Sequence, residues 1–281
     1  MARERRHGAM NPSTKQKRRS ALFGWAMFDW AAQPFYTLVV TFLFAPYFVN
    51  GFVADPARGA ALWAYAIGIS QLIAAALAPV LGAIADTGQP RKPWIGGFSA
   101  LLVIGLCGLW FAIPGHHDLI PLVLVSFGIA LIGVELATVF TNAMMPSLIS
   151  GRRLGTLSGI GWATGYVGGL ISLMLIAGLV VADPITGKTM LGLDPIVPLD
   201  PATREGDRLI GPFSAIWYVI FVLPLFLFTP DRSAKPLMDG AVRAGLVQLV
   251  QSVKDLVRHH GQVALFLLAR MLYADLSLIH I

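Results

Sequence analysis

Six long stretches of the sequence are almost free of charge, and they constrain the fold more than any other feature. The helices predicted within them cover approximately residues 21–49, 60–85, 93–114, 119–147, 155–182 and 211–229. Only the first and the fourth contain a charged residue, Asp29 and Glu135. A helix needs about 20 residues to cross a hydrocarbon core of roughly 30 Å. The sequence therefore predicts an all-α membrane protein with a bundle of six transmembrane helices in residues 21–229.

The composition supports lipid rather than water as the solvent around these helices. Hydrophobic residues make up 56% of the 281 residues and charged residues 13%, whereas a soluble domain has about 25% charged residues. A buried all-α core in a soluble protein is the alternative, but core helices are usually shorter and amphipathic. The single cysteine, Cys107, cannot form an intrachain disulfide.

The basic residues are distributed unevenly between the two sides of the predicted bundle. With the N-terminus inside, sixteen Lys and Arg residues lie in inner segments and four in outer segments. Because cytoplasmic loops collect Lys and Arg, we expect a basic cytoplasmic tail at residues 1–20 and a central cytoplasmic loop at residues 230–260. The same rule explains the net charge of +6 without a nucleic-acid partner. We expect a multi-pass protein of the bacterial inner membrane.

The central loop has a helical pattern of its own. Leu246, Leu249, Val253 and Leu256 recur at helical spacing, with basic residues between them. This pattern predicts a basic amphipathic helix on the inner membrane surface. A helix packed on another cytoplasmic loop is the alternative. A further apolar run at residues 261–275 predicts the start of a seventh transmembrane helix.

Asp29 and Glu135 fall near the middle of their predicted helices. A charged side chain at that depth costs on the order of 3 kcal/mol on insertion scales. Each acid must therefore border water, find a hydrogen-bond donor or bind a proton. We expect both to face a hydrated cavity and to bind protons or a cationic solute. The alternative is a hydrogen bond to a neighbouring polar side chain, with four candidates: Gln33, Gln71, Thr138 and Asn142.

Other residues of these helices are candidates for the cavity wall and for helix packing. We expect Gln33, Asn142 and Tyr166 to supply polar and aromatic contacts to a solute. Three glycines of the fifth predicted helix recur at every fourth residue, Gly161, Gly165 and Gly169. Small residues at this spacing allow membrane helices to approach closely, so we expect them to pack against a neighbouring helix.

The loop after the second predicted helix resembles a signature of membrane transporters. It reads GAIADTGQPRKPW. The major facilitator superfamily has a cytoplasmic loop with a small residue at a helix end, an Asp, a Gly turn and then Arg and Lys. The matching residues here are Gly82, Asp86, Gly88, Arg91 and Lys92. By this resemblance they form a cytoplasmic gate motif, in which a carboxylate, two cations and helix dipoles latch the inner side.

Three further stretches resemble the vacuole effluxer family, whose autophagy-related fungal members export amino acids. They read FDWAAQPFYT from Phe28, FTNAMMPSLI from Phe140 and SGIGWATGYVGG from Ser158. Residues 32–34 depart from the family pattern. The resemblance covers nearly the whole chain and implies a secondary transporter with two six-helix halves, in which the first and fourth helices line a central cavity.

The last six residues, LSLIHI at 276–281, do not continue the seventh helix that this resemblance implies. They match one reading frame of a transposon-end adapter used in sequencing libraries, and we interpret them as foreign sequence. On this interpretation the chain is the N-terminal half of a 12-helix carrier, and its partner is the missing C-terminal half.

These features together predict a secondary active transporter that exports a small solute, such as an amino acid, across the lipid bilayer. Protons are expected to couple through Asp29 and Glu135. A six-helix channel or a membrane scaffold without coupled transport is the alternative. The motifs GxxxxGK[ST], HExxH and GxSxG do not occur, which disfavours an enzyme. We expect no metal ion and no other cofactor.

Overall fold

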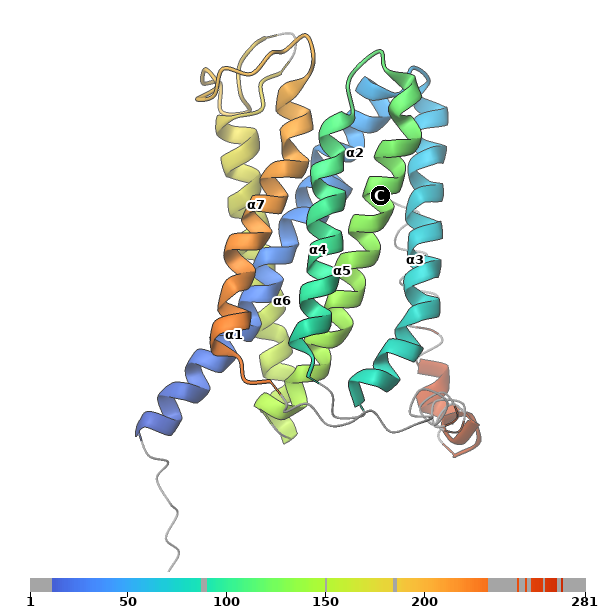
Figure 1. The fold of residues 1–281 in the computed structure, drawn as a ribbon, viewed down its shortest axis with the longest axis vertical. Coiled ribbons are helices and arrows are strands. Elements are labelled where there is room, and N and C mark those ends of the chain that lie inside the picture. Colours follow the sequence, from blue (N-terminus) through green and yellow to red (C-terminus); the bar gives the residue numbers. More distant parts are fainter. Residues whose placement is uncertain are drawn as a thin grey trace, which may run out of the picture.

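The computed structural model describes residues 12–86, 90–149, 151–183 and 186–231, together with short stretches between 247 and 269. The described residues form a bundle of long helices that lie alongside one another (Figure 1). Six helices in this part of the chain are long and apolar enough to cross a membrane, by length and composition. The predicted all-α membrane fold with six spans is confirmed.

The first span is a composite helix. It consists of α1 (Pro12–Pro34), the π-helix η1 (Phe35–Phe42), the short α2 (Phe44–Tyr47) and a second π-helix η2 (Phe48–Phe52). The helix begins earlier than the predicted residue 21, so residues 12–20 of the predicted tail are already helical. The predicted end at residue 49 lies three residues before Phe52.

Pro34 accounts for the change from α to π geometry. Proline has no N–H and clashes with the carbonyl group four residues earlier, which here belongs to Trp30. That carbonyl oxygen instead accepts a hydrogen bond from Nε1 of Trp217, at 3.1 Å. The two indole rings stack with their centroids 6.0 Å apart. A neighbouring helix therefore satisfies the carbonyl that the proline leaves without its usual partner, as membrane helices with proline require.

The other five spans are more regular. They are α3 (Pro56–Asp86), α4 (Lys92–Gly108) with the 3-10 turn η3 (Leu109–Phe111), and α5 (Ile120–Leu148), preceded by η4 (His117–Leu119). They continue with α6 (Leu154–Leu179), preceded by η5 (Gly151–Arg153), and α7 (Glu205–Phe228). Four of these helices begin within four residues of the predicted position; α7 begins at residue 205 instead of 211.

The helices pack in a defined order around α1 and α5. α1 contacts α6 and α7, α4 contacts α5 and α7, and α3 contacts α5. Glycines permit the close approach of α4 and α5, since a Cβ on Gly133 would lie 2.6 Å from the backbone nitrogen of Leu102. A Cβ on Gly105 would likewise lie 2.6 Å from the backbone nitrogen of Ala130. Close backbone approach at small residues is the usual way in which membrane helices associate.

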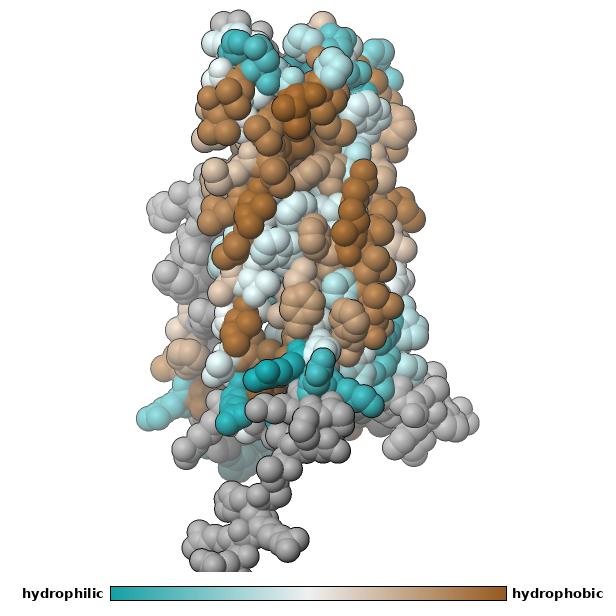
Figure 2. All heavy atoms as spheres, turned by 90° about the vertical axis from the view of Figure 1, so that its left-hand side faces the viewer, coloured by the Kyte–Doolittle hydropathy of each residue, from teal (hydrophilic) through white to brown (hydrophobic). Residues whose placement is uncertain are grey.

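The outer surface of the bundle is apolar along its length. Large hydrophobic side chains such as Ile69, Leu72, Ile104 and Leu227 are exposed. Figure 2 shows brown hydrophobic side chains along one face, with teal hydrophilic side chains gathered toward its two ends. An apolar patch of this extent is not stable in water, so lipid must cover it.

The two ends of the bundle differ in charge and in their contacts. We call the end where α1 begins and α7 finishes the basic end, because Arg19, Arg91, Lys92 and Arg153 lie there; the opposite end, with residues 186–204, is the loop end. At the basic end the carboxylate of Asp231 accepts hydrogen bonds from the backbone N–H groups of Arg91 (2.9 Å) and Lys92 (2.8 Å). These bonds cap the start of α4.

At the loop end, paired polar side chains explain the early start of α7. Nε of Arg204 donates to Asp207 at 2.6 Å, and this bond raises the pKa of the Arg204 guanidinium. Arg208 lies over the ring of Trp110 at 4.4 Å and donates through Nε to the Trp110 carbonyl oxygen at 2.8 Å. Each charge in the first turn therefore has a partner, which the apolar pattern alone did not predict.

Several predicted segments lie wholly or mostly outside the described residues. They are residues 1–11 of the basic tail, most of the central loop at 230–260, most of the predicted seventh helix at 261–275, and the stretch 276–281. Within 254–259 and 261–266 the described residues are helical. The amphipathic helix, the seventh span and the foreign origin of the last six residues stay predictions.

Candidate functional site

A cavity of about 420 Å³ lies between α1, α5 and α6. We call it the acidic cavity, because both predicted intramembrane acids line it. Its wall contains twelve residues: Trp25, Phe28, Asp29, Ala32, Gln33, Tyr36, Glu135, Thr138, Asn142, Ser158, Trp162 and Tyr166. All five residues predicted as transport or cavity residues, Asp29, Glu135, Gln33, Asn142 and Tyr166, are among them.

Helical periodicity places the side chains that each helix contributes on a single face of that helix. α1 and η1 contribute residues 25, 28, 29, 32, 33 and 36, α5 contributes 135, 138 and 142, and α6 contributes 158, 162 and 166. Side chains three and four residues apart lie on the same face of a helix. The cavity is open on the α6 side, because Trp162 and Tyr166 remain 64% and 56% exposed.

Glu135 has a partner within the bundle. The hydroxyl group of Tyr36 donates a hydrogen bond to Oε1 of Glu135, with the two oxygens 3.3 Å apart. Two of the four predicted alternative partners, Thr138 and Gln33, donate to other groups. Thr138 donates to the carbonyl oxygen of Val134 at 2.8 Å, and Gln33 donates to Thr37 at 3.5 Å.

Glu135 also borders a second, smaller cavity. This space of about 200 Å³ lies between α3 and α5 and is lined mainly by small and apolar side chains, with Gln71 as the other polar residue. The Glu135 side chain therefore lines both cavities. A carboxyl group in that position can exchange a proton with either space.

Asp29 is held differently from Glu135. Within the described ranges, no group donates a hydrogen bond to its carboxylate. Instead the side chain lies against the glycine surface of α6, where a Cβ on Gly161 would touch its Oδ2 and a Cβ on Gly165 would lie 3.2 Å from its Cβ. The carboxylate is half-buried and faces the acidic cavity, so a proton or a cation from that space can reach it.

The three predicted packing glycines all face the first span. Besides the contacts of Gly161 and Gly165 with Asp29, a Cβ on Gly169 would lie 2.5 Å from Oγ1 of Thr37. All three glycines are buried. The spacing of small residues thus coincides with the surface where α6 meets α1.

Seven of the twelve wall residues were not predicted as site residues, among them Tyr36, Trp25 and Ser158. Tyr36 supplies the donor to Glu135, Trp25 donates through Nε1 to the carbonyl oxygen of Thr141 at 2.8 Å, and Ser158 lies one turn before Trp162. Their positions follow from helical spacing: Tyr36 is seven residues after Asp29, and Ser158 is eight before Tyr166. Extending each face by one or two turns from the predicted residues would have found them.

The described residues of the predicted gate motif lie at the basic end, and part of the motif is outside the described residues. Gly88 and the side chain of Asp86 are not described, while Gly82 is half-buried at the end of α3. Besides the backbone bonds of Arg91 and Lys92 to Asp231, Nζ of Lys92 donates to the carbonyl oxygen of Phe226 at 2.7 Å. The described contacts therefore tie the start of α4 to the end of α7.

The described part of the chain contains no group of three or more His, Cys, Asp or Glu residues that could hold a metal ion. Six membrane-length helices, three of which line a cavity with two carboxylates, define a multi-pass, all-α membrane protein. Sequence comparison identifies its family. The family described as "Vacuole effluxer Atg22 like" matches residues 47–155 and 151–277, and the chain belongs to this family.

Two curated relatives are similar over much of the chain. An "Uncharacterized MFS-type transporter YxiO" from Bacillus subtilis (strain 168) is 29% identical over 256 residues, which are 89% of this chain and 56% of the relative. An "Uncharacterized protein" from Aquifex aeolicus (strain VF5) is 32% identical over 187 residues, 64% of this chain and 47% of the relative. The chain spans about half the length of these relatives. The predicted resemblance to the vacuole effluxers and to the major facilitator superfamily is confirmed.

Proposed function

We propose that this chain forms half of a secondary active transporter that exports a small amino-bearing solute, such as an amino acid, in exchange for protons. The observation that carries the proposal is the position of Asp29 and Glu135 on one cavity inside a membrane-spanning bundle. Isolated charges are costly in a bilayer, so intramembrane acids usually mark a path for ions or solutes. The description of the matching family as effluxers supports export and points away from an enzyme.

The chemistry of the acidic cavity suits an amino group. A carboxylate is a strong partner for an ammonium group, and Asp29 has an open side toward the cavity. Trp25, Trp162 and Tyr166 surround the same space, and aromatic faces attract cations. A volume of about 420 Å³ is within the range of small-molecule sites, about 300–1,000 Å³.

The remaining wall can hold the acidic end of such a solute. Gln33 and Asn142 present amide groups to the same cavity, and an amide N–H donates to a carboxylate. A proton and an ammonium group would compete for Asp29, which links the release of one to the binding of the other. Glu135, between its two cavities, would pass the proton onward.

The rest of the carrier is part of the proposal. The acidic cavity is open on the α6 side, and we propose that a C-terminal half closes it. The basic end lies in the cytoplasm by the distribution of Lys and Arg, so a reporter fused after residue 231 is expected to be cytoplasmic in a bacterial inner membrane. Gly82, Asp86, Gly88, Arg91 and Lys92 would act there as the gate motif.

Equilibrium binding to the full-length protein in detergent tests the proposed solute. Radiolabelled L-amino acids are compared with their deamino analogues, which lack the ammonium group. Asp29→Asn is expected to weaken amino-acid binding about tenfold, the effect of losing one charge-assisted hydrogen bond. Asp118→Asn, which changes an exposed acid of η4, is the control and should bind normally. Equal binding of the deamino analogues, or full binding by Asp29→Asn, would contradict the proposal; a channel or scaffold would give that result.

A further inference from the structure

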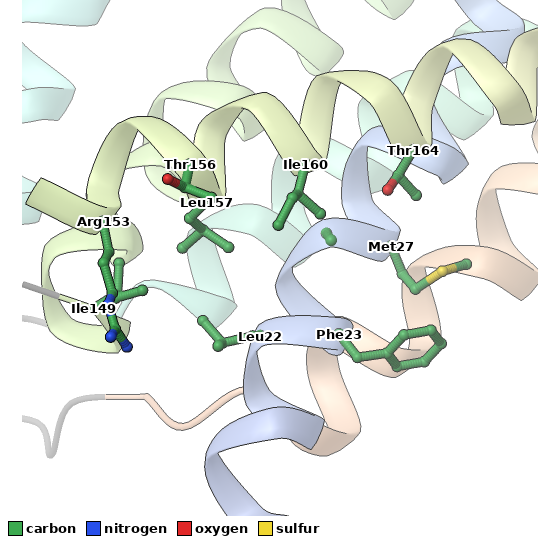
Figure 3. Close-up of a pocket in the computed structure, with 10 residues that line it drawn as sticks. Leu22, Phe23, Met27, Ile149, Arg153, Thr156, Leu157, Ile160 and Thr164 are labelled. Carbon is green, nitrogen blue, oxygen red and sulfur yellow. The ribbon is translucent and has the colours of Figure 1, made fainter.

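A second cavity of about 420 Å³ lies on a different face of the bundle, near the basic end. α1 forms one wall with Leu22, Phe23 and Met27, and α6 forms the other with Ile160 and Thr164 (Figure 3). We call it the Arg153 groove, because Arg153 is the one charged residue in its described wall. No residue of the acidic cavity lines it.

Helical geometry directs the Arg153 groove away from the acidic cavity. On α6, Ile160 lies two residues before Trp162, and Thr164 lies two residues before Tyr166. Trp162 and Tyr166 line the acidic cavity. Two residues correspond to about 200° around an α-helix. The groove therefore opens on the side of α6 opposite to the acidic cavity. The proposed second half closes the acidic cavity, so the apolar surface on the opposite side is left to lipid.

The length of the groove matches one leaflet of a bilayer. Arg153 and Thr164 are eleven residues apart, which is about 16 Å along a helix. That is roughly half of a hydrocarbon core of about 30 Å. The wall between them is apolar apart from threonine hydroxyl groups, so it can hold an acyl chain that enters from one membrane surface.

The charged end of the groove suits an anionic head group. Arg153 extends from the start of α6 into the space between the helices (Figure 3), and it is exposed, with no acidic side chain paired to it in the described part of the chain. Arg19, also exposed, lies four residues before Phe23 and hence on the same face of α1. No acidic residue lies in the first turn of α6, and that turn favours negative charge.

We propose that the Arg153 groove binds an anionic phospholipid from the leaflet at the basic end, with its phosphate between Arg153 and Arg19 and one acyl chain along Ile160. Basic pockets between membrane helices are known to hold anionic head groups. A free phosphate ion would use the arginines but leave the apolar length of the groove without a role, so the phospholipid accounts for more of the wall.

Native mass spectrometry of the full-length protein, titrated with phosphatidylglycerol or phosphatidylcholine, tests this site. The wild type is expected to retain phosphatidylglycerol more tightly. Arg153→Gln should weaken that retention about fivefold, and the double variant with Arg19→Gln about 25-fold. Arg58→Gln, an exposed arginine at the other end of the bundle, is the matched control and should behave as the wild type.

A second variant tests the acyl chain independently of charge. Ile160→Trp fills the groove and should reduce phosphatidylglycerol retention, whereas Ile216→Trp on the exposed face of α7 should not. Inorganic phosphate should not displace the lipid. Unchanged retention in Arg153→Gln and Ile160→Trp, displacement by phosphate alone, or a second protein chain in place of the lipid would each overturn the proposal. Solute binding does not enter this experiment, so its outcome is independent of the proposed transport function.

Discussion

At the scale of single residues, the two intramembrane acids have different surroundings on one cavity. Glu135 accepts a hydrogen bond from Tyr36, whereas Asp29 rests against glycines and faces open space. Their presence could be predicted, because a lone charge in an apolar stretch stands out in the sequence. The partner of Glu135 could not, because Tyr36 is 99 residues away in the chain and the pairing depends on how α1 and α5 pack.

The variant Tyr36→Phe tests the pairing at Glu135. It removes the hydroxyl donor and leaves the ring, so we expect a loss of about 1 kcal/mol in the free energy of unfolding. Thermal unfolding in detergent measures the loss. Tyr65→Phe, on an exposed tyrosine of α3, is the control. Equal stability of Tyr36→Phe and the wild type would show that the hydrogen bond contributes nothing.

At the scale of elements, the length of each apolar stretch predicted a membrane span. The local geometry of the helices depends on tertiary contacts, which these stretches did not predict. The π-helix after Pro34 depends on Trp217, which satisfies the Trp30 carbonyl group. The early start of α7 depends on partners for Asp207 and Arg208. Neither contact leaves a periodic signal in its own segment. By contrast, the spacing of small residues in α6 predicted a packing surface, and those residues lie against α1.

The glycines of α6 allow a matched comparison. Gly161→Ala would place a methyl group against Oδ2 of Asp29, so we expect it to destabilise the protein and to reduce solute binding. At Gly159, no atom lies within 4 Å of an added Cβ. Gly159→Ala should therefore leave the free energy of unfolding unchanged or raise it by up to about 1 kcal/mol, since alanine has a higher helix propensity than glycine. Thermal unfolding of both variants checks this. If Gly161→Ala were as stable as Gly159→Ala, the close contact of α6 with α1 would be wrong.

At the scale of the whole molecule, the chain is a helical bundle whose acidic cavity is open on one side. Its curated relatives are about twice as long, which supports the proposed second half as the missing wall. Long uncharged stretches and a low content of charged residues predicted a lipid environment from the sequence alone. The convergence of twelve residues from α1, α5 and α6 on one cavity required the folded arrangement, because each helix contributes one face and the sequence does not say which faces meet.

Solute flux in proteoliposomes that contain the full-length protein tests the central claim most directly. With a pH gradient imposed, the wild type is expected to move an amino acid against its concentration gradient, while Asp29→Asn abolishes the dependence on the gradient and Glu135→Gln reduces it. Asp118→Asn, the control at an exposed acid of η4, should transport normally. Amino-acid flux that responds to the pH gradient equally in Asp29→Asn and the wild type would contradict the account.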